Sequence, residues 1–216
     1  MALTFHHGQG SPFSWRVWLA LEFKAVAYEL RVLSFAAGDT TKPDFVAINP
    51  RHQVPTIVDE GFALWESAAI VEYLDERFPA GPKLFPGDAR NRARIRRLVR
   101  EVDEYLLHAA VEVVTAELFF KKEGEAPDMA KVDQARVAWA REAKYFAQEL
   151  RGEFLGGEAP CAADFALYTA FGYSKRITVR KPESRLTESI PEPLAAWARR
   201  IEALSYFDPT YPPHWR

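Results

Sequence analysis

Residues 54–79, VPTIVDEGFALWESAAIVEYLDERFP, decide the fold of the first third of the chain. Two short β-prone runs, Thr56–Val58 and Ala63–Trp65, flank a Glu60-Gly61 turn and predict a hairpin. A helix is expected directly after it, with Ser67 as its N-cap and its end before the next proline. The buried face of this helix would consist of Ile70, Val71, Leu74 and Phe78.

The residues before this stretch alternate strand and helix signals. Leu3–Phe5 is short and β-prone, Arg16–Lys24 carries apolar residues at helical spacing, and Tyr28–Leu33 alternates like a strand. Pro43–Ile48 can form one or two helical turns. The predicted order is therefore βαβαββα, which describes an α/β domain over residues 1–79.

A cluster of helix and strand breakers follows this domain. Residues 79–88, PAGPKLFPGD, hold three prolines and two glycines, so we place the domain linker at 80–88. An all-helical domain is expected from 89 to 216, giving an α/β plus all-α chain. Its amphipathic helices are expected over residues 95–113, 132–150, 162–172 and 194–204. The pattern does not predict how the proline-rich, aromatic tail 207–216 packs.

The composition narrows the class of protein. The chain has 216 residues, 48% of them hydrophobic, and a formal net charge of −2, so neither nucleic acid nor an anionic membrane is an expected partner. No run of about 18 apolar residues occurs, and membrane insertion is not expected. The single cysteine, Cys161, excludes an intrachain disulfide and favours a cytoplasmic location.

Ser11 and Ser14 lie between the first strand and the first helix. A hydroxyl just before a helix N-terminus can donate a hydrogen bond to a bound anion such as a thiolate. A thiol with a pKa near 8.5 is only about 3% ionised at pH 7, and lowering that pKa by about two units requires roughly 2.7 kcal/mol. One charge-assisted hydrogen bond at a helix terminus supplies energy of this size. The alternative is that both serines are ordinary turn or N-cap residues.

Two further segments suggest a binding site for a peptide-like ligand. His52-Gln53-Val54-Pro55 leads into the hairpin, and a proline there leaves the residue before it extended, with backbone groups able to pair with a ligand. Glu66-Ser67 opens a helix and can hold an ammonium group and a carboxylate. The alternatives are an ordinary strand-edge proline and a plain N-cap.

Three segments together resemble the glutathione-site motifs of soluble glutathione transferases. They are Ser11-Pro-Phe-Ser-Trp-Arg-Val-Trp-Leu-Ala-Leu, Asn49-Pro-Arg-His-Gln-Val-Pro-Thr and Glu66-Ser-Ala-Ala-Ile-Val-Glu-Tyr-Leu-Asp-Glu-Arg-Phe-Pro. Ala163-Asp164-Phe165 also resembles the start of the buried helix in that family's C-terminal domain. The resemblance implies a thioredoxin-like first domain, a homodimer, and glutathione as co-substrate without a metal.

The same resemblance implies a role for each motif. Ser11 would donate its hydroxyl to the glutathione thiolate, and Val54 would pair with the cysteinyl residue next to a cis Pro55. Ser14, in the same turn as Ser11, is a separate candidate for a residue that supports it. The remaining contacts would hold the two ends of the tripeptide: Glu66 and Ser67 the γ-glutamyl end, and His52 and Gln53 the glycyl end.

The second substrate is expected to be an apolar electrophile for conjugation, or an organic hydroperoxide for reduction. Aromatic and polar side chains from both domains are candidates for its pocket. These candidates are Phe13, Trp15, Phe35, Tyr105 and His108.

Residues that differ from the family pattern argue against particular classes of glutathione transferase. The serine motif resembles the zeta and tau classes, yet Phe13 stands where a zeta-type isomerase has cysteine, which argues against a maleylacetoacetate isomerase. The absence of a cysteine near Ser11 argues against classes that form a mixed disulfide with glutathione. Cys161 stands where the family usually has Ser or Thr, so it would be a weak structural cap paired with Asp164. A non-catalytic binding protein of the same fold remains a further alternative.

Overall fold

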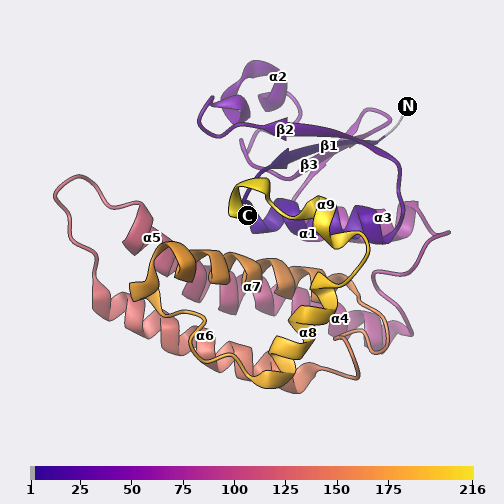
Figure 1. Ribbon diagram of the computed structural model, residues 1–216. Helices are drawn as coiled ribbons and strands as arrows, with labels where there is room; N and C mark the ends of the chain where they lie inside the picture. Colours follow the sequence, from indigo (N-terminus) through magenta and orange to yellow (C-terminus); the bar gives the residue numbers. More distant parts are fainter. Residues whose placement is uncertain (1–2) are drawn as a thin grey trace. The chain divides into compact units, whose positions relative to one another are not determined.

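The computed structural model describes residues 3–216 (Figure 1). The contacts divide it into two compact units: the residues up to Gly87 together with Leu204–Arg216 form unit 1, and Asp88–Ala203 form unit 2. The sequence pattern assigns residues 204–216 to the helical domain, but they group with unit 1. The reason is that their aromatic side chains pack around Trp15 of the first helix.

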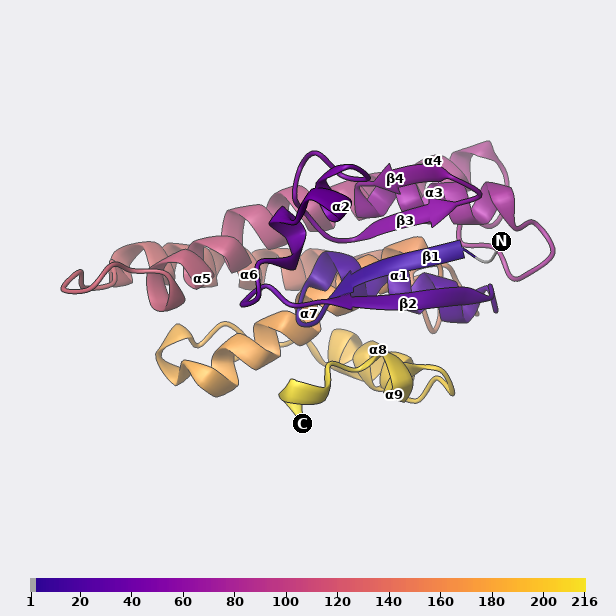
Figure 2. The same cartoon turned by 90° about the horizontal axis from the view of Figure 1, so that it is seen from above.

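Unit 1 is built on a mixed four-stranded sheet. Its strands are β1 (Leu3–Gly8), β2 (Tyr28–Leu33), β3 (Thr56–Asp59) and β4 (Phe62–Trp65). The strand order is β2-β1-β3-β4, as Figure 2 shows from above, with β2 parallel to β1 and the β1–β3 and β3–β4 pairs antiparallel. Thr56 pairs with His6 on one side and with Trp65 on the other.

The helices of unit 1 follow the predicted order, which confirms βαβαββα and the thioredoxin-like fold. They are α1 (Pro12–Phe23), α2 (Pro43–Val46), α3 (Ser67–Arg77) and, after unit 2, α9 (Phe207–Thr210), with 3₁₀ turns at Asp39–Thr41 and Pro213–Trp215. The helices α1 and α3 pack together on one side of the sheet, and α2 lies on the other side (Figure 1). The side chains in the core of unit 1 are fully buried and include Phe5, Val17, Leu21, Ile57, Ile70 and Leu74.

One local expectation in unit 1 was wrong. Ser67 is the first residue of α3 and is buried, so Glu66 occupies the N-cap position instead. Glu66 makes no side-chain capping hydrogen bond, and its φ of 68° lies in the left-handed region. The N-terminus of α3 is therefore shaped by an unusual backbone conformation and not by a serine cap.

Unit 2 is all helical, as expected. Its elements are α4 (Ala89–Glu101), a π-helix (Val102–Val111), α5 (Glu112–Phe119), α6 (Met129–Glu149), α7 (Ala162–Arg180), a 3₁₀ turn (Pro182–Ser184) and α8 (Glu192–Glu202). The helix expected over 162–172 is eight residues longer, because the chain continues past Gly172 without a break. The π-helix joins α4 to α5 and was not expected, since the sequence shows no proline or glycine there.

The start of α7 organises the centre of unit 2. Asp164 is buried and accepts hydrogen bonds of 2.8 Å from the backbone N–H groups of Leu155 and Cys161 and from the indole Nε1 of Trp197. Cys161 is the N-cap of α7 and forms a reciprocal capping box with Asp164. Burial raises the pKa of the Cys161 thiol well above its usual range, so the group stays protonated and unreactive.

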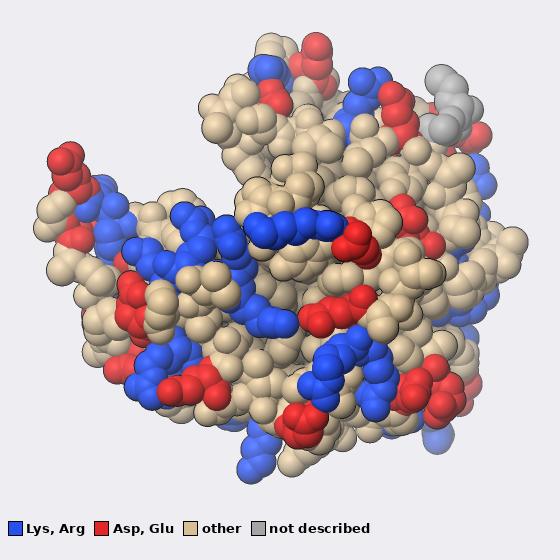
Figure 3. All heavy atoms as spheres, in the orientation of Figure 1, with Lys and Arg blue, Asp and Glu red and all other residues tan. Residues whose placement is uncertain are grey.

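Ion pairs engage part of the arginine-rich helix α4. Arg94 contacts Glu149 at 2.8 Å, and Arg97 contacts Glu101 at 2.8 Å and Glu149 at 3.1 Å. Basic and acidic side chains are also interspersed over the face shown in Figure 3. None of the helices within residues 3–216 combines the length and the hydrophobicity that spanning a bilayer requires.

Candidate functional site

The pairing register brings the three predicted site segments to one end of the sheet of unit 1. Continuing the β1–β3 pairing beyond His6 and Thr56 sets Gly8 opposite Val54. Continuing the β3–β4 pairing beyond Thr56 and Trp65 sets Pro55 opposite Glu66. Since neighbouring strands lie about 4.8 Å apart, the turn before α1, the Val54-Pro55 segment and the start of α3 are neighbours there.

Ser11 is the N-cap of α1. Its Oγ accepts a hydrogen bond of 3.2 Å from the backbone N–H of Ser14, and its own N–H donates to the Gly8 carbonyl at 3.1 Å. Because the oxygen acts as acceptor toward the helix, the hydroxyl hydrogen remains available to donate outward. Ser11 is half-buried, so a ligand at the helix start can reach it. The position combines a hydroxyl donor with the positive end of the α1 dipole.

Ser14 supports the turn from within. It is fully buried, and its Oγ lies 3.4 Å from the backbone N–H of Gly8. A Cβ at Gly8 would stand 2.5 Å from Cζ of Phe35 and 2.7 Å from Cγ2 of Val54, so a larger residue there would displace these side chains. Phe35 therefore lies beside Val54 and next to the Ser11 turn.

The segment that leads into β3 is held by a buried amide. Asn49 donates from Nδ2 to the Gln53 carbonyl at 2.7 Å and to Oγ1 of Thr56 at 2.9 Å. The Val54–Pro55 peptide bond is cis, as predicted. Within residues 3–216, neither the N–H nor the C=O of Val54 has a hydrogen-bond partner. Val54 thus presents an unpaired stretch of extended backbone of the kind that binds peptides by strand addition.

Two non-glycine residues of the site have left-handed backbone conformations. His52 has φ 58° and Glu66 has φ 68°, and both side chains are exposed. Each such conformation costs about 1–3 kcal/mol and concentrates at functional sites. The exposed side chain of Gln53 follows His52, whereas Ser67 is buried at the first position of α3.

The two histidines at the end of β1 point to opposite faces of the sheet. His7 is buried, and its ring packs against Trp18 with the centroids 4.7 Å apart, while His6 packs against Phe45. Burial lowers the pKa of His7 to about 4, so it is neutral near pH 7. Neither histidine therefore supplies a positive charge to the site at neutral pH.

The five candidates for the second-substrate pocket differ in exposure. Trp15 is only 1% exposed, and we assign it to the core of unit 1 and not to a pocket wall. Phe13 is half-buried with the Arg16 guanidinium 5.2 Å from its ring, and Phe35 is 56% exposed. In unit 2, Tyr105 is 50% exposed, and Nδ1 of the exposed His108 lies 2.8 Å from Glu112.

The sequence analysis assigned no role to several residues that shape the site but have no chemical role in it. Asn49 and Thr56 fix the segment before the cis proline, and Gly8 and Gly10 allow the side chains of Phe35 and His214 to approach the backbone closely. Asn49-Pro50 is a recognisable turn signal and could have indicated the structural role of Asn49 and Thr56. The contacts of Gly10 come from the C-terminal residues and leave no local signal.

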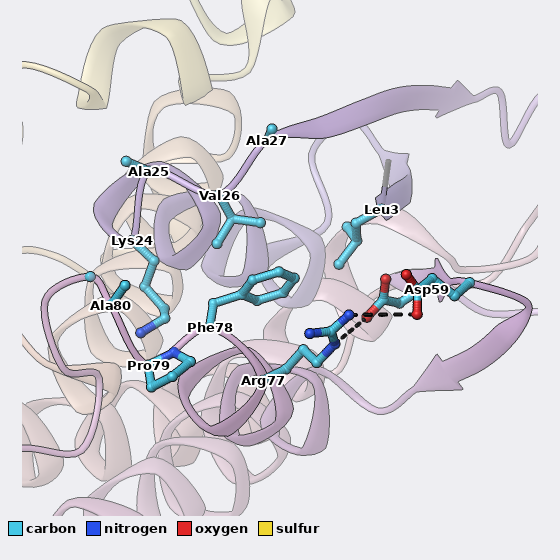
Figure 4. Close-up of a pocket in the computed structure, with 12 residues that line it drawn as sticks. Leu3, Lys24, Ala25, Val26, Ala27, Asp59, Arg77, Phe78, Pro79 and Ala80 are labelled. Atoms are coloured by element: carbon cyan, nitrogen blue, oxygen red, sulfur yellow. Dashed lines mark hydrogen bonds and ion pairs between the residues drawn. The ribbon is translucent and has the colours of Figure 1, made fainter. Parts of the chain in front are cut away.

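A separate cavity of about 420 Å³ lies at the opposite end of the sheet of unit 1. The residues at the end of α1 and of α3 line it, and the Arg77 guanidinium bridges Asp59 and Glu60 beside it (Figure 4). None of the predicted glutathione contacts lines this cavity. Within residues 3–216, no group of three or more His, Cys, Asp or Glu side chains is arranged to bind a metal ion.

The sequence and the fold of this chain both resemble those of known proteins. Residues 10–77 match the family model described as "Glutathione S-transferase, N-terminal domain". Glutathione S-transferase D7 of Drosophila melanogaster is 30% identical over 190 residues, which cover 84% of this chain and 81% of the relative.

Solved structures show the same fold. A glutathione S-transferase from the Antarctic clam Laternula elliptica aligns with a TM-score of 0.79 and 25% identity, covering 100% of this chain and 94% of that one. A Tau class glutathione S-transferase from mango, Mangifera indica, aligns with a TM-score of 0.81 and 24% identity, covering 98% and 93%.

Proposed function

This chain belongs to the glutathione S-transferase family, and we propose that it activates the thiol of its substrate glutathione through Ser11. One observation carries the proposal. Ser11 Oγ accepts the Ser14 N–H at the start of α1, which leaves the hydroxyl hydrogen free to donate to a sulfur atom beside the helix N-terminus. The same end of the sheet presents the unpaired Val54 backbone for a peptide.

The energy required for this activation is modest. Free glutathione, with a thiol pKa near 8.5, is about 3% ionised at pH 7. A hydrogen bond from Ser11 to the thiolate contributes about 1.5–3 kcal/mol, and the helix terminus adds about 0.3–1 kcal/mol. Together these terms lower the thiol pKa by about one to three units, which makes the thiolate a major species at neutral pH.

The rest of the tripeptide would be held by the neighbouring segments. In this proposal the Val54 backbone pairs with the cysteinyl residue, next to the cis Pro55. The γ-glutamyl end lies at the start of α3, where Glu66 holds the ammonium group and the N-terminus near Ser67 holds the carboxylate. His52 and Gln53, both exposed, reach the glycyl carboxylate.

The second substrate is proposed to be an apolar electrophile or an organic hydroperoxide. For conjugation, the thiolate forms a carbon–sulfur bond by addition, or displaces a leaving group that departs with its electron pair. Phe13 and Phe35 in unit 1, and Tyr105 and His108 in unit 2, remain proposed contacts of this substrate, and Phe35 and Tyr105 are each exposed. Trp15, which belongs to the core, is not among them.

An isomerase of the maleylacetoacetate type is the alternative activity, and Phe13 speaks against it. A panel of aryl halides, organic hydroperoxides, isothiocyanates and maleylacetoacetate analogues, each with glutathione, separates the activities. Turnover confined to the last group would replace conjugation with isomerisation.

Replacing Ser11 tests the proposal directly. Ser11→Ala should lower turnover of a model aryl halide about 10–100-fold at neutral pH while calorimetry still detects glutathione binding, because the sulfur contact is lost and the contacts to the peptide remain. Ser11→Thr is the matched control, because it keeps a hydroxyl and a good N-cap. Wild-type turnover in a folded Ser11→Ala enzyme would remove Ser11 from the mechanism.

We also propose a homodimer, which the family resemblance implies. Sedimentation of the purified chain should give about twice its mass of 24.6 kDa. A monomer at micromolar concentration would contradict this proposal.

A further inference from the structure

The C-terminal segment, Leu204–Arg216, is an integral part of unit 1. Its helix α9 contacts α1, and its end lies beside α1 in Figure 1. Thr210 accepts a hydrogen bond of 3.0 Å from Nε1 of Trp15, and three aromatic rings surround the Trp15 indole. The ring centroids lie 5.9, 5.6 and 5.5 Å from that of Trp15 for Phe207, Tyr211 and Trp215.

The last residues of this segment reach the turn that carries Ser11. A Cβ built on Gly10 would stand 3.1 Å from Nε2 of His214 and 3.6 Å from Nε1 of Trp215. Gly10 also has φ +85°, a conformation that other residues rarely adopt. The imidazole of His214 and the indole of Trp215 therefore pack directly on the residue that precedes Ser11.

The turn needs support from outside its own sequence. It contains Gly8 and Gly10, and glycine restricts the backbone less than any other residue. On its inner side, Ser14 Oγ lies 3.4 Å from the Gly8 N–H. His214 and Trp215 supply the packing at Gly10.

We propose that His214 and Trp215 are positioning residues, which hold the Gly10–Ser11 turn so that the Ser11 hydroxyl stays aimed at the sulfur of glutathione. This inference rests on the proposed role of Ser11. Such a group acts on the sulfur through the backbone of the turn, so it affects thiolate formation more than peptide binding.

The test uses the full chain and two altered forms of it, His214→Ala and a deletion of residues 212–216. Each should lower kcat with an aryl halide about tenfold and raise the pKa of the bound glutathione thiol, because small misplacements of a reacting group are costly. The Kd for glutathione should stay within about threefold of wild type. Arg216→Ala is the matched control, since Arg216 bonds to Asp208 inside the same segment.

The outcomes separate this inference from the function on which it rests. A raised thiol pKa in His214→Ala, together with a wild-type thiol pKa in Arg216→Ala, supports the inference. If the deletion variant does not fold, the result for His214→Ala alone decides. A wild-type thiol pKa and kcat in folded His214→Ala overturn the inference, while Ser11→Ala can still lose activity. If Ser11→Ala itself keeps the wild-type thiol pKa, both proposals fail together.

Discussion

His7 at the end of β1 is a buried histidine in a largely aromatic environment. Neither ring nitrogen has a hydrogen-bond partner within residues 3–216, and the rings of Trp18 and Phe5 lie 4.7 and 5.6 Å away between centroids. Burial without a partner disfavours the imidazolium, which is why the pKa falls to about 4. His7 therefore contributes to the stability of the folded protein only while its imidazole is neutral.

This burial predicts a pH dependence of stability. The unfolded chain binds the proton near its usual pKa of about 6.5 and the folded chain only near 4, so the unfolded state carries more protons between these values. The contribution is complete above about pH 6.5 and declines as the pH falls to 4, by about 3 kcal/mol. Denaturant unfolding of wild type and His7→Phe at pH 7, 5.5 and 4.5 should show a smaller slope in the variant.

His6 is also partly buried and its pKa is also lowered, so part of the slope remains in His7→Phe. An identical slope in wild type and His7→Phe would show that His7 is not protonated on unfolding.

At the scale of elements, the start of α7 combines a weak cap with a strong buried acceptor. Cys161 replaces the usual hydroxyl cap, whereas Asp164 satisfies backbone groups of Leu155, Gly156 and Cys161. Sulfur is a weak hydrogen-bond acceptor, so most of the capping energy comes from the carboxylate.

Two substitutions test this division of the capping energy. Cys161→Ser should leave the free energy of unfolding unchanged or raise it by about 0.5–1 kcal/mol, because a hydroxyl is the better cap. Asp164→Ala should lower it by about 3 kcal/mol or more, since several buried donors lose their acceptor. Equal losses in both variants, measured by denaturant unfolding, would contradict the assignment.

The periodicity of apolar residues predicted most helices and strands. It failed where the feature that determines the local structure is not periodic. The hairpin around Glu60-Gly61 and the helix after it follow from alternation and turn chemistry. The π-helix at Val102–Val111 does not, because its buried residues recur in adjacent pairs every four positions, close enough to an α-helical pattern to be read as one. The Ser67 cap was wrong because a left-handed Glu66 is not visible in composition.

At the scale of the whole molecule, the proposed thiol site depends on residues from both ends of the described chain. Ser11, Val54 and Glu66 were predicted because their motifs are local, and the sheet register explains why they converge. The support from His214 and Trp215 was not predicted, since the Trp15–Thr210 hydrogen bond that anchors their segment spans 195 residues. Contacts of such separation have no periodic signature in sequence.

Glutathione binding should therefore stabilise the folded chain as a whole. At a concentration 100 times the Kd, the ligand adds about 2.7 kcal/mol to the free energy of unfolding, detectable as a rise in Tm. Glu66→Ala should lose most of this rise at the same glutathione concentration, whereas Glu76→Ala, exposed on the same helix, should keep it. An equal rise in both variants would remove Glu66 from the γ-glutamyl contact.

The pKa of the bound glutathione thiol tests the role of Ser11 most directly. It is measured by following thiolate absorbance against pH in complexes of wild type, Ser11→Ala and Ser11→Thr. We predict a thiol pKa about one to three units below that of free glutathione in wild type and in Ser11→Thr, and a return toward the free value in Ser11→Ala. A Ser11→Ala complex that binds glutathione and keeps the wild-type thiol pKa would contradict the account.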